Sequence, residues 1–267
     1  MPNPPLILVR PPSPDLARGE LTHLDRADVD PGLAREQWAG YLDAFRRHGW
    51  EVVQVEPADE HPDGVFVEDT VVVVDRLVVL TSPGTASRRA EVASTRRALD
   101  RLVADGVALE VAAIEGDGRL DGGDVLQVAD VVYVGQSRRT NAEGTRQLTR
   151  LLEPLGRRVV GVPVTKALHL KSEVTALPDG TVIGYPPLVD DPRLFPAFRP
   201  VPEEHGTAVV DLGGGAVLIS EDAPRTAALF AEAGLRVEPV AIGEFEKLEG
   251  CVTCLSVRIP GVPGASS

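Results

Sequence analysis

The chain has 267 residues, of which 43% are hydrophobic and 25% charged, a composition typical of a soluble globular protein with a large core. Its formal net charge is -13, from 40 acidic and 27 basic residues. This charge argues against nucleic acid as a partner and is compatible with a small cationic substrate. No apolar run approaches the ~20 residues of a transmembrane helix, and the first residues lack a signal-peptide pattern, so we expect a cytoplasmic protein.

The first predicted helix spans residues 31–48. Asp30 is a suitable N-cap, Pro31 fits the first helical position, and Gly49 is a suitable terminator. A strand over residues 50–55 is predicted to follow. The apolar face of this helix has helical spacing and consists of Ala34, Trp38, Tyr41, Leu42 and Phe45.

The order of helix, glycine and strand recurs three more times. Helices are predicted over residues 88–105 and 141–155 and in a segment ending at residue 233, each followed by a glycine and a β-rich strand. Thr140 and Glu143 have the spacing of a capping box for the second of these helices. Residues 87–106 and 137–156 align without gaps and share Ser-Arg-Arg, Thr-Arg, a leucine and the final glycine. This internal repeat predicts a fold built from repeated modules.

Four pairs of strands separated by short turns are predicted between the helices. They span residues 65–74 with 77–80, 125–128 with 131–134, 174–177 with 181–184, and 207–212 with 216–220. Together the elements predict a ββαβ module that occurs about five times, with a helix-poor copy near residues 190–198. No Gly- or Ser-rich linker divides the chain, so we expect one domain over residues 1–267, with its modules around a pseudo-rotation axis.

Residues with reactive side chains fall at equivalent places in these modules. Glu68-Asp69, Asp121 and His169 each lie near the first strand of a pair, and Cys254 lies in a β-like closing segment over residues 252–259. A cyclic array would direct these positions to a common centre. A cysteine thiolate is a strong nucleophile, and His169 is the best candidate to pair with it and to protonate a leaving amine. Taken singly, an inert buried thiol and an ordinary core histidine are the alternatives.

Carboxylates and arginines indicate a cationic amino-acid substrate. Acidic side chains suit a guanidinium, whose N–H groups pair with carboxylate oxygens. Arg88 and Arg139 stand near predicted helix starts, where they suit a substrate carboxylate. The adjacent acids Glu68 and Asp69 in the strand-like run 65–74 violate strand propensity, as functional residues often do. Asp63 is also explained by the turn that Pro-Asp-Gly forms at residues 62–64. The candidate carboxylates are Asp63, Glu68, Asp69 and Asp121.

Cys251 and Cys254 have the spacing of a redox pair and of half a zinc site. The predicted strand would make positions i and i+3 face opposite sides, and zinc needs about four ligands. Both readings are therefore disfavoured, and we expect Cys251 to pack in the core. A redox or zinc protein stays open as an alternative and predicts a reversible disulfide or bound metal.

Four segments together resemble the dimethylarginine dimethylaminohydrolase family of the pentein, or guanidino-modifying, superfamily. They are Pro-Asp-Gly-Val-Phe-Val-Glu-Asp at 62–69, Ser-Arg-Arg-Thr-Asn-Ala-Glu-Gly at 137–144, Leu-His-Leu-Lys at 168–171 and Thr-Cys-Leu-Ser at 253–256. The resemblance covers residues 8–259 and is specific in the combination, order and spacing of the motifs. It implies a five-bladed α/β propeller of ββαβ modules, in agreement with the repeat.

The resemblance also implies a reaction: hydrolysis of Nω-methylated arginines to citrulline and a methylamine, without metal or cofactor. Cys254 would be the nucleophile, His169 the general acid and base, and Asp121 a neighbour of His169 and the guanidinium. We expect the acidic site to keep the empty Cys254 mostly protonated. A homodimer is what the family suggests. Substrate would be bound at its guanidino end by Glu68 and Asp69, at its α-amino and α-carboxylate groups by Asp63, Arg88 and Arg139, and through backbone groups by Leu21 and Leu248.

Other functions stay open. An arginine deiminase or an amidinotransferase of the same superfamily would share the cysteine, the histidine and the carboxylates, although the compact length, without an inserted helical domain, favours the dimethylarginine enzyme. A non-catalytic binder of arginine derivatives is the alternative of a different class. The combination of Cys254, His169 and Asp121 argues against it.

Overall fold

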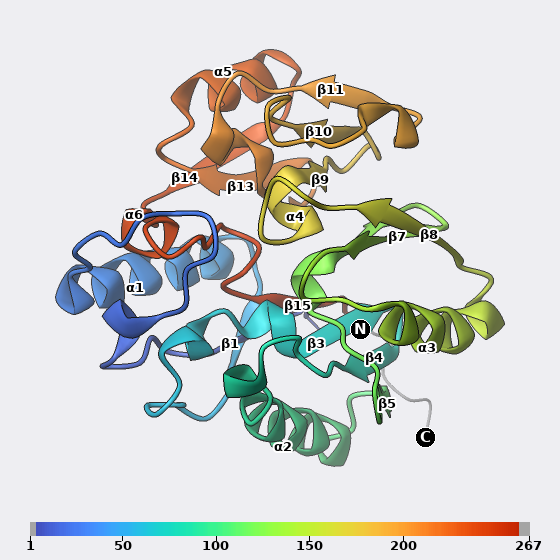
Figure 1. Cartoon of the computed structure of the whole chain (residues 1–267). Helices are drawn as coiled ribbons and strands as arrows, with labels where there is room; N and C mark the ends of the chain where they lie inside the picture. Colours follow the sequence, from blue (N-terminus) through green and yellow to red (C-terminus); the bar gives the residue numbers. More distant parts are fainter. Residues whose placement is uncertain (1–3, 262–267) are drawn as a thin grey trace.

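Five three-stranded sheets stand around one axis in the computed structural model, which describes residues 4–261 (Figure 1). In every sheet the middle strand pairs antiparallel with one neighbour and parallel with the other. This is the predicted five-bladed α/β propeller of ββαβ modules, and the prediction is confirmed. That residues 1–267 form a single domain stays a prediction.

The first sheet joins the two ends of the described chain. Its middle strand β1 (Leu6–Val9) pairs in parallel with β2 (Glu51–Gln54) and antiparallel with β15 (Val257–Ile259). Leu6 therefore faces both Glu51 and Ile259 in register. Pairing of the first and last strands closes the ring.

The other four sheets each come from one continuous stretch of chain. They are β3 (Val71–Val74), β4 (Leu77–Leu80) and β5 (Glu110–Ala113); β6 (Val125–Val128), β7 (Val131–Gln136) and β8 (Arg158–Pro163); β9 (Val174–Ala176), β10 (Val182–Gly184) and β11 (Phe198–Pro200); and β12 (Val209–Gly213), β13 (Ala216–Ser220) and β14 (Arg236–Val240). The predicted strand pairs match these sheets, except that the first pair is shorter than expected.

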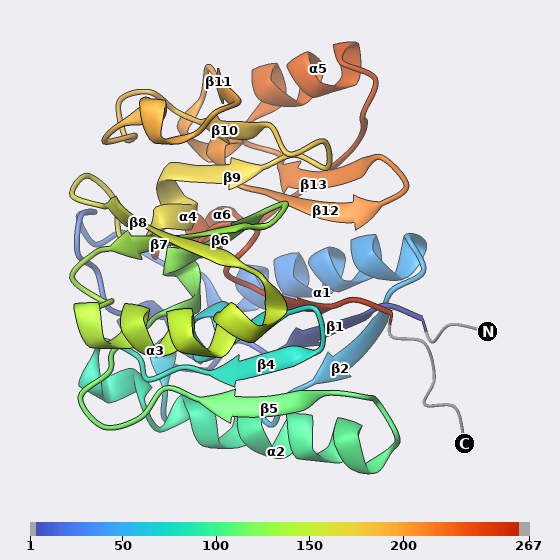
Figure 2. The same ribbon diagram turned by 90° about the vertical axis from the view of Figure 1, so that its right-hand side faces the viewer.

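Crossover helices lie on the outside of the ring (Figures 1 and 2). In the fourth sheet only a 3-10 turn, Pro192–Leu194, replaces the helix, as the helix-poor sequence predicts. Within residues 4–261, no helix has the length and apolar character needed to span a membrane. The helices are α1 (Pro31–Arg47), α2 (Glu91–Ala104), α3 (Ala142–Leu152), the short α4 (Leu170–Glu173), α5 (Pro224–Glu232) and the short α6 (Gly243–Glu246).

Helix caps follow the sequence at α1 but not at α3. The Asp30 side chain accepts from the backbone at the start of α1, as predicted. The predicted capping box at Thr140 is wrong, because Asn141 caps α3. The Thr140 hydroxyl instead donates to buried Asp124, 2.6 Å away. The Thr140 side chain therefore holds Asp124 instead of capping α3.

Two segments predicted as strands are turns. Glu68 and Asp69 lie in a 3-10 turn, Val67–Thr70, and β3 begins only at Val71. The closing strand begins at Val257, so Cys254 also lies in a turn. In both segments the chain is buried on all sides, which gives a turn the continuous apolar pattern of a buried strand.

A cavity of about 430 Å³ occupies the axis between the innermost strands. Its lining includes one or more residues from the innermost strand of each sheet: Val72, Leu126, Thr175, Val210 and Val257. Apolar packing occurs in five clusters around this cavity, between neighbouring sheets and helices, rather than in one central core. The start of each inner strand therefore points to a shared central space.

Candidate active site

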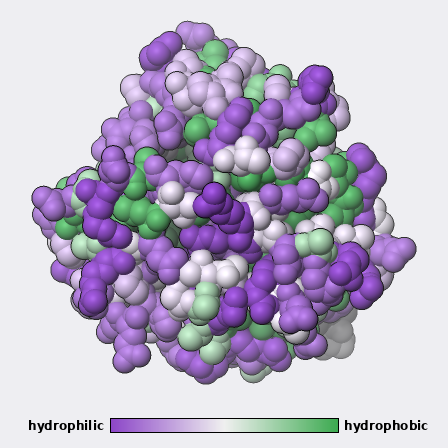
Figure 3. Space-filling view, in the orientation of Figure 1, coloured by the Kyte–Doolittle hydropathy of each residue, from purple (hydrophilic) through white to green (hydrophobic). Residues whose placement is uncertain are grey.

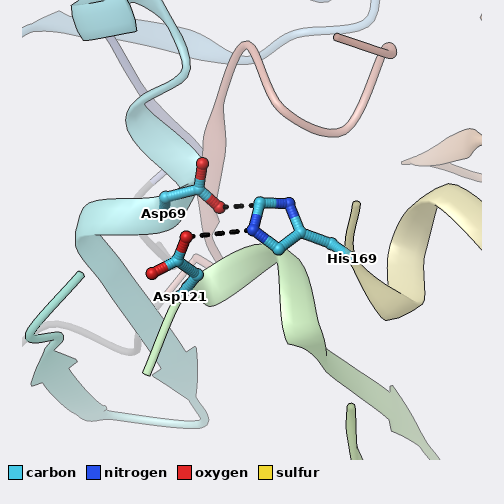
Figure 4. Close-up of side chains that lie close together, drawn as sticks. All are labelled: Asp69, Asp121 and His169. Atoms are coloured by element: carbon cyan, nitrogen blue, oxygen red, sulfur yellow. Dashed lines mark hydrogen bonds and ion pairs between the residues drawn. The ribbon is translucent and has the colours of Figure 1, made fainter. Parts of the chain in front are cut away.

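Three of the predicted residues lie just ahead of the inner strands of three successive sheets. The turn that holds Asp69 leads into β3, Asp121 precedes the 3-10 turn Gly122–Asp124 and β6, and His169 precedes α4 and β9. Their side chains converge although up to 100 residues separate them (169 − 69) (Figure 4). The repeat in the sequence thus places one chemical group per module at the axis.

His169 lies between two carboxylates. Its Nε2 is 2.9 Å from Oδ2 of Asp121, and its Nδ1 is 3.9 Å from Oδ1 of Asp69 (Figure 4). All three side chains are buried. Burial lowers the pKa of His169, but the surrounding carboxylates outweigh it and raise the pKa to about 9. At neutral pH the empty site therefore holds an imidazolium, which is a proton donor.

The sequence Asp121-Gly-Gly-Asp124 holds this histidine from two directions. Asp121 contacts the ring, while Oδ1 of Asp124 accepts from the backbone N–H of Leu170 at 3.0 Å. Gly122 permits the close packing, because a Cβ atom there would lie 2.0 Å from the carbonyl oxygen of Glu68. Asp124 is fully buried, and burial raises its pKa to about 6. Its role was missed in the sequence because the motif also resembles a simple glycine turn.

Asp69 is held by Arg88. The Arg88 guanidinium pairs with the Asp69 carboxylate, and it also pairs with Glu91 through Nε–Oε1 at 3.1 Å and Nη2–Oε2 at 2.8 Å. Burial alone would raise the pKa of Asp69, but His169 and Arg88 together lower it to about 2. Arg88 also donates to two backbone carbonyls, so few of its N–H groups remain for a substrate. Glu91, a buried partner that the sequence analysis missed, stands at the i+3 position of an ordinary helical pair.

Cys254 lies in a turn in which its N–H donates to the carbonyl oxygen of Cys251 at 3.1 Å. The contact with the Cys251 sulfur, burial, and the negative charges of Glu68 and Asp69 raise the pKa of the Cys254 thiol. This direction agrees with the expectation of a protonated thiol in the empty site. The inference that Cys251 and Cys254 face opposite sides is wrong, since the turn brings their Sγ atoms to 3.2 Å.

A small cavity of about 20 Å³ adjoins the thiol. This volume holds about one water and is too small for an amino acid. Seven predicted residues line it, namely Asp63, Asp69, Arg88, Arg139, His169, Leu248 and Cys254. Four residues that were not predicted also line it: Glu20, Phe66, Leu168 and Glu249. Leu21, Glu68 and Asp121 lie outside its lining.

Glu68 separates this cavity from the larger one on the axis. Its Oε1 lies 2.6 Å from Nζ of Lys171, and its Oε2 accepts from the Thr253 hydroxyl at 3.1 Å. All three residues line the axial cavity. The Glu68 N–H donates to the carbonyl oxygen of Cys254 at 3.3 Å, which ties this barrier to the cysteine turn.

The loop over residues 19–26 covers the small cavity. Asp63 accepts the backbone N–H of Glu20 at 3.2 Å, and Leu21 packs against the nearest apolar cluster. The Glu249 carboxylate accepts the N–H groups of Thr22, at 3.0 Å, and of the two residues that follow. Arg139 reaches the same loop more loosely, with Nη2 3.8 Å from Oε2 of Glu20. Carboxylates therefore hold this loop at the edge of the small cavity, which Glu20 lines.

The surface around the site is polar, and the site holds one group of possible metal ligands. Figure 3 shows that the face seen in Figure 1 is mostly hydrophilic, its centre included, as suits a polar substrate. One group within residues 4–261, Asp69, Asp121 and His169, offers ligand atoms within 4.8 Å of one another. These atoms already form hydrogen bonds and ion pairs with one another, with Arg88 and with the Gly84 N–H, which donates to Asp121 at 2.7 Å. The absence of a metal cofactor stays a prediction.

A five-bladed α/β propeller that gathers a cysteine, a histidine and carboxylates at its axis defines the pentein class of guanidino-modifying enzymes. No protein-family model matches the chain. The chain is 57% identical over 252 residues to the N(G),N(G)-dimethylarginine dimethylaminohydrolase of Streptomyces coelicolor, covering 94% of this chain and 96% of the relative. It is 33% identical over 256 residues to the protein of the same name from Pseudomonas aeruginosa, covering 94% and 98%. The chain belongs to the dimethylarginine dimethylaminohydrolase family.

Solved structures give the same result. A dimethylarginine dimethylaminohydrolase adduct with S-methyl-L-thiocitrulline superposes with a TM-score of 0.87 at 31% identity, covering 97% of this chain and all of that one. A Pseudomonas aeruginosa variant complexed with citrulline gives 0.85 at 31% identity, covering 95% and 98%. The N-terminal domain of ArgZ, a cyanobacterial arginine dihydrolase, shares the fold with a TM-score of 0.81 at 20% identity, covering 96% and 98%.

Proposed function

We propose that the chain hydrolyses Nω,Nω-dimethyl-L-arginine and monomethyl-L-arginine to L-citrulline and the corresponding methylamine. The observation that carries the proposal is that a single buried cavity is lined by a thiol, a protonated histidine and charged groups of both signs. The family membership supports the same reaction. Among the solved relatives, the ligands named as citrulline and S-methyl-L-thiocitrulline are amino acids, whose α-amino and α-carboxylate charges suit the charged lining of this cavity.

The first half of the proposed reaction forms a covalent bond to sulfur. Substrate brings a cation next to Asp69 and Glu68, which offsets the negative field that holds Cys254 protonated, and the thiol loses its proton to solvent. Sγ then attacks the guanidinium carbon. His169 donates its proton to the departing amine nitrogen, so that dimethylamine leaves and a thiouronium remains on Cys254.

The second half uses the same histidine in the opposite direction. His169, now neutral, takes a proton from a water molecule that attacks the thiouronium carbon. The tetrahedral adduct collapses with cleavage of the C–S bond, which gives citrulline and returns the thiol. Asp121 keeps the ring oriented through both steps, because Nε2 stays bonded to its carboxylate at 2.9 Å.

The charged lining supports one orientation of the substrate. The guanidino end would lie toward Asp69, with Glu68 behind it, and the α-amino group toward Asp63 and the backbone of Leu21 and Leu248. Arg139 is the better of the two arginines for the α-carboxylate, because its side chain is 12% exposed and loosely paired. Arg88, which is saturated by Glu91, Asp69 and two carbonyls, would act by holding Asp69.

The ligand in this proposal is a small arginine derivative. A cytoplasmic location, a homodimer and the absence of nucleic-acid and membrane partners stay predictions.

Product analysis tests the function directly. Purified protein is incubated with asymmetric dimethylarginine and, separately, with arginine, and Cys254→Ser serves as the control. We expect citrulline and dimethylamine from the methylated substrate alone, lost in the variant. Citrulline and ammonia from arginine would instead indicate a deiminase on the same scaffold. Failure to turn over either substrate would contradict the proposal and favour another guanidino compound or a binding role.

A further inference from the structure

Cys251 lies against the sulfur of Cys254. Cys251 and Cys254 are both free thiols, and their Sγ atoms lie 3.2 Å apart. The backbone N–H of Cys251 also approaches Sγ of Cys254 at 3.4 Å. Thr253, between them, places its hydroxyl 3.2 Å from the Cys251 sulfur. Cys251 thus adjoins the reacting sulfur, besides packing against the neighbouring apolar cluster as expected.

The geometry is close to that of a disulfide. An S–S bond is about 2.05 Å long, so the two sulfurs need to approach by roughly 1.2 Å. The hydrogen bond from the Cys254 N–H to the Cys251 carbonyl already folds the four-residue turn that such a bond requires. Cys254 lines the small cavity, so an oxidant that enters the site meets its sulfur, and the half-buried Cys251 lies directly against that sulfur.

We propose that Cys251 is the resolving thiol of Cys254: a hydroperoxide converts the pair into an intramolecular disulfide that stops hydrolysis reversibly. The regulatory consequence rests on the proposed function, because it assigns the nucleophile to Cys254. The chain has two cysteines in all, so this pair is the one intramolecular disulfide it can form.

The oxidation balances with a hydroperoxide as the sole oxidant. The sulfur of Cys254 attacks the peroxide, the O–O bond breaks, and a sulfenic acid and one molecule of water (from hydrogen peroxide) are formed. The sulfur of Cys251 then attacks the sulfenic sulfur. The S–S bond forms, the S–O bond breaks, and the hydroxyl group leaves with the Cys251 proton as a second water. Two thiols have lost two electrons and two protons, and the peroxide has gained them.

The local electrostatics suit the second of these steps. The contact between the sulfurs lowers the pKa of Cys251, while the same contact, burial and nearby carboxylates raise that of Cys254. Cys251 is thus the more readily ionised sulfur, as a resolving thiol has to be. Without it, a sulfenic acid on Cys254 is exposed to further peroxide and goes on to the irreversible sulfinic acid.

The experiment compares the whole protein with its Cys251→Ser variant, which keeps the backbone N–H next to Cys254. Both are treated with hydrogen peroxide, quenched, denatured and alkylated, and their intact masses and peptides are measured. Activity on dimethylarginine is followed before treatment, after it, and after dithiothreitol. Each activity is expressed relative to the same protein before peroxide, so a difference in starting rate does not matter.

We expect the wild-type chain to lose two hydrogens, to take up no alkylating agent and to yield a peptide with a Cys251–Cys254 bond. Its activity should fall about tenfold or more and return with dithiothreitol, whereas the variant should gain two or more oxygens and regain little. Wild-type protein that gains oxygen on Cys254 while Cys251 is still alkylated would overturn the proposal. Disulfides between chains would overturn it equally. If the variant does not fold, the wild-type masses alone decide whether the two cysteines pair. They also decide it if the untreated protein is inactive. Inactivity of the untreated protein would count against the proposed function and not against the disulfide.

Discussion

Gly123 stands directly against the imidazole of His169: a Cβ atom at this position would lie 2.6 Å from Nδ1, and 2.9 Å from Oδ1 of Asp69. Contacts this short force a shift, and the atoms to be displaced are the proton donor and its neighbouring acid. The second glycine of the Asp-Gly-Gly-Asp sequence is therefore a requirement of the site and not merely of a turn.

Gly123→Ala should consequently reduce kcat by roughly a hundredfold, because displacing reacting groups by about 1 Å costs that much. The measurement is steady-state kinetics, with circular dichroism to show that the fold persists. Gly40→Ala is the matched control, since Gly40 lies in α1 with nothing within 4 Å of its Cβ position. Equal activity in the two alanine variants would show that the close contact has no importance for catalysis.

Asp121→Asn should shift the pH profile. The pKa of His169 is raised to about 9, so kcat/KM should fall as the pH rises through this value and the proton donor is lost. Removing the negative charge beside Nε2 lowers this pKa, and the alkaline limb should move to lower pH by about one unit or more. Asp130→Asn, in an exposed turn, should leave the limb in place. An unmoved alkaline limb in Asp121→Asn would mean that another group sets it.

The raised pKa of His169 should also make the stability of the folded protein depend on pH. A histidine whose pKa is raised on folding stabilises the folded state fully below its ordinary pKa, about 6.5, and loses this contribution as the pH rises through about 9. The melting temperature of the empty wild-type protein should therefore fall more steeply between these pH values than that of Asp121→Asn. Parallel curves for the two proteins would contradict the raised pKa.

The two arginines of the cavity should respond differently to substitution. Arg139→Gln should raise KM by about tenfold or more and change kcat little, as expected for loss of a carboxylate contact. Arg88→Gln removes the guanidinium that pairs with buried Asp69 and Glu91, so it should lower both the melting temperature and kcat. Arg138→Gln, exposed and adjacent, is the control. If Arg88→Gln raised KM alone, Arg88 would be the residue that binds the carboxylate.

Glu249→Gln tests whether the Glu249 carboxylate holds the loop over residues 19–26. The substitution removes a charged acceptor of the backbone N–H groups over residues 22–24, and hydrogen bonds to a charged group contribute about 1.5–3 kcal/mol. Amide exchange of these three residues should accelerate by about tenfold or more, because 1.4 kcal/mol corresponds to tenfold. Glu232→Gln, exposed at the end of α5, should leave their exchange unchanged. Unaltered exchange in Glu249→Gln would show that this carboxylate does not hold the loop.

Much of the fold could be predicted because each module carries its own local signals. Asp30, Pro31 and Gly49 mark the ends of α1 to within two residues of its observed bounds, Pro31–Arg47, and the repeat at residues 87–106 and 137–156 gives the module length. Such signals depend only on neighbours in sequence. The cyclic arrangement then follows from repetition, and it places the groups that precede the inner strands at one centre.

What could not be predicted depends on partners distant in sequence. Asp124 reaches Leu170 and Lys171 reaches Glu68, pairs that are 46 and 103 residues apart. Nothing near either residue in sequence indicates the contact. The cysteine turn has the apolar pattern of a strand because it is buried on all sides, so its sequence does not indicate the approach of Cys251 to Cys254.

Closure of the ring by β15 has a consequence for how the protein is made. Cys254 stands three residues ahead of this strand (257 − 254), whereas Asp121 and His169 belong to modules completed earlier in synthesis. A nascent chain therefore already carries Asp121 and His169 when Cys254 is made. The thiol takes its place only when β15 adds to the free edge of β1, so the event that completes the first sheet also completes the site.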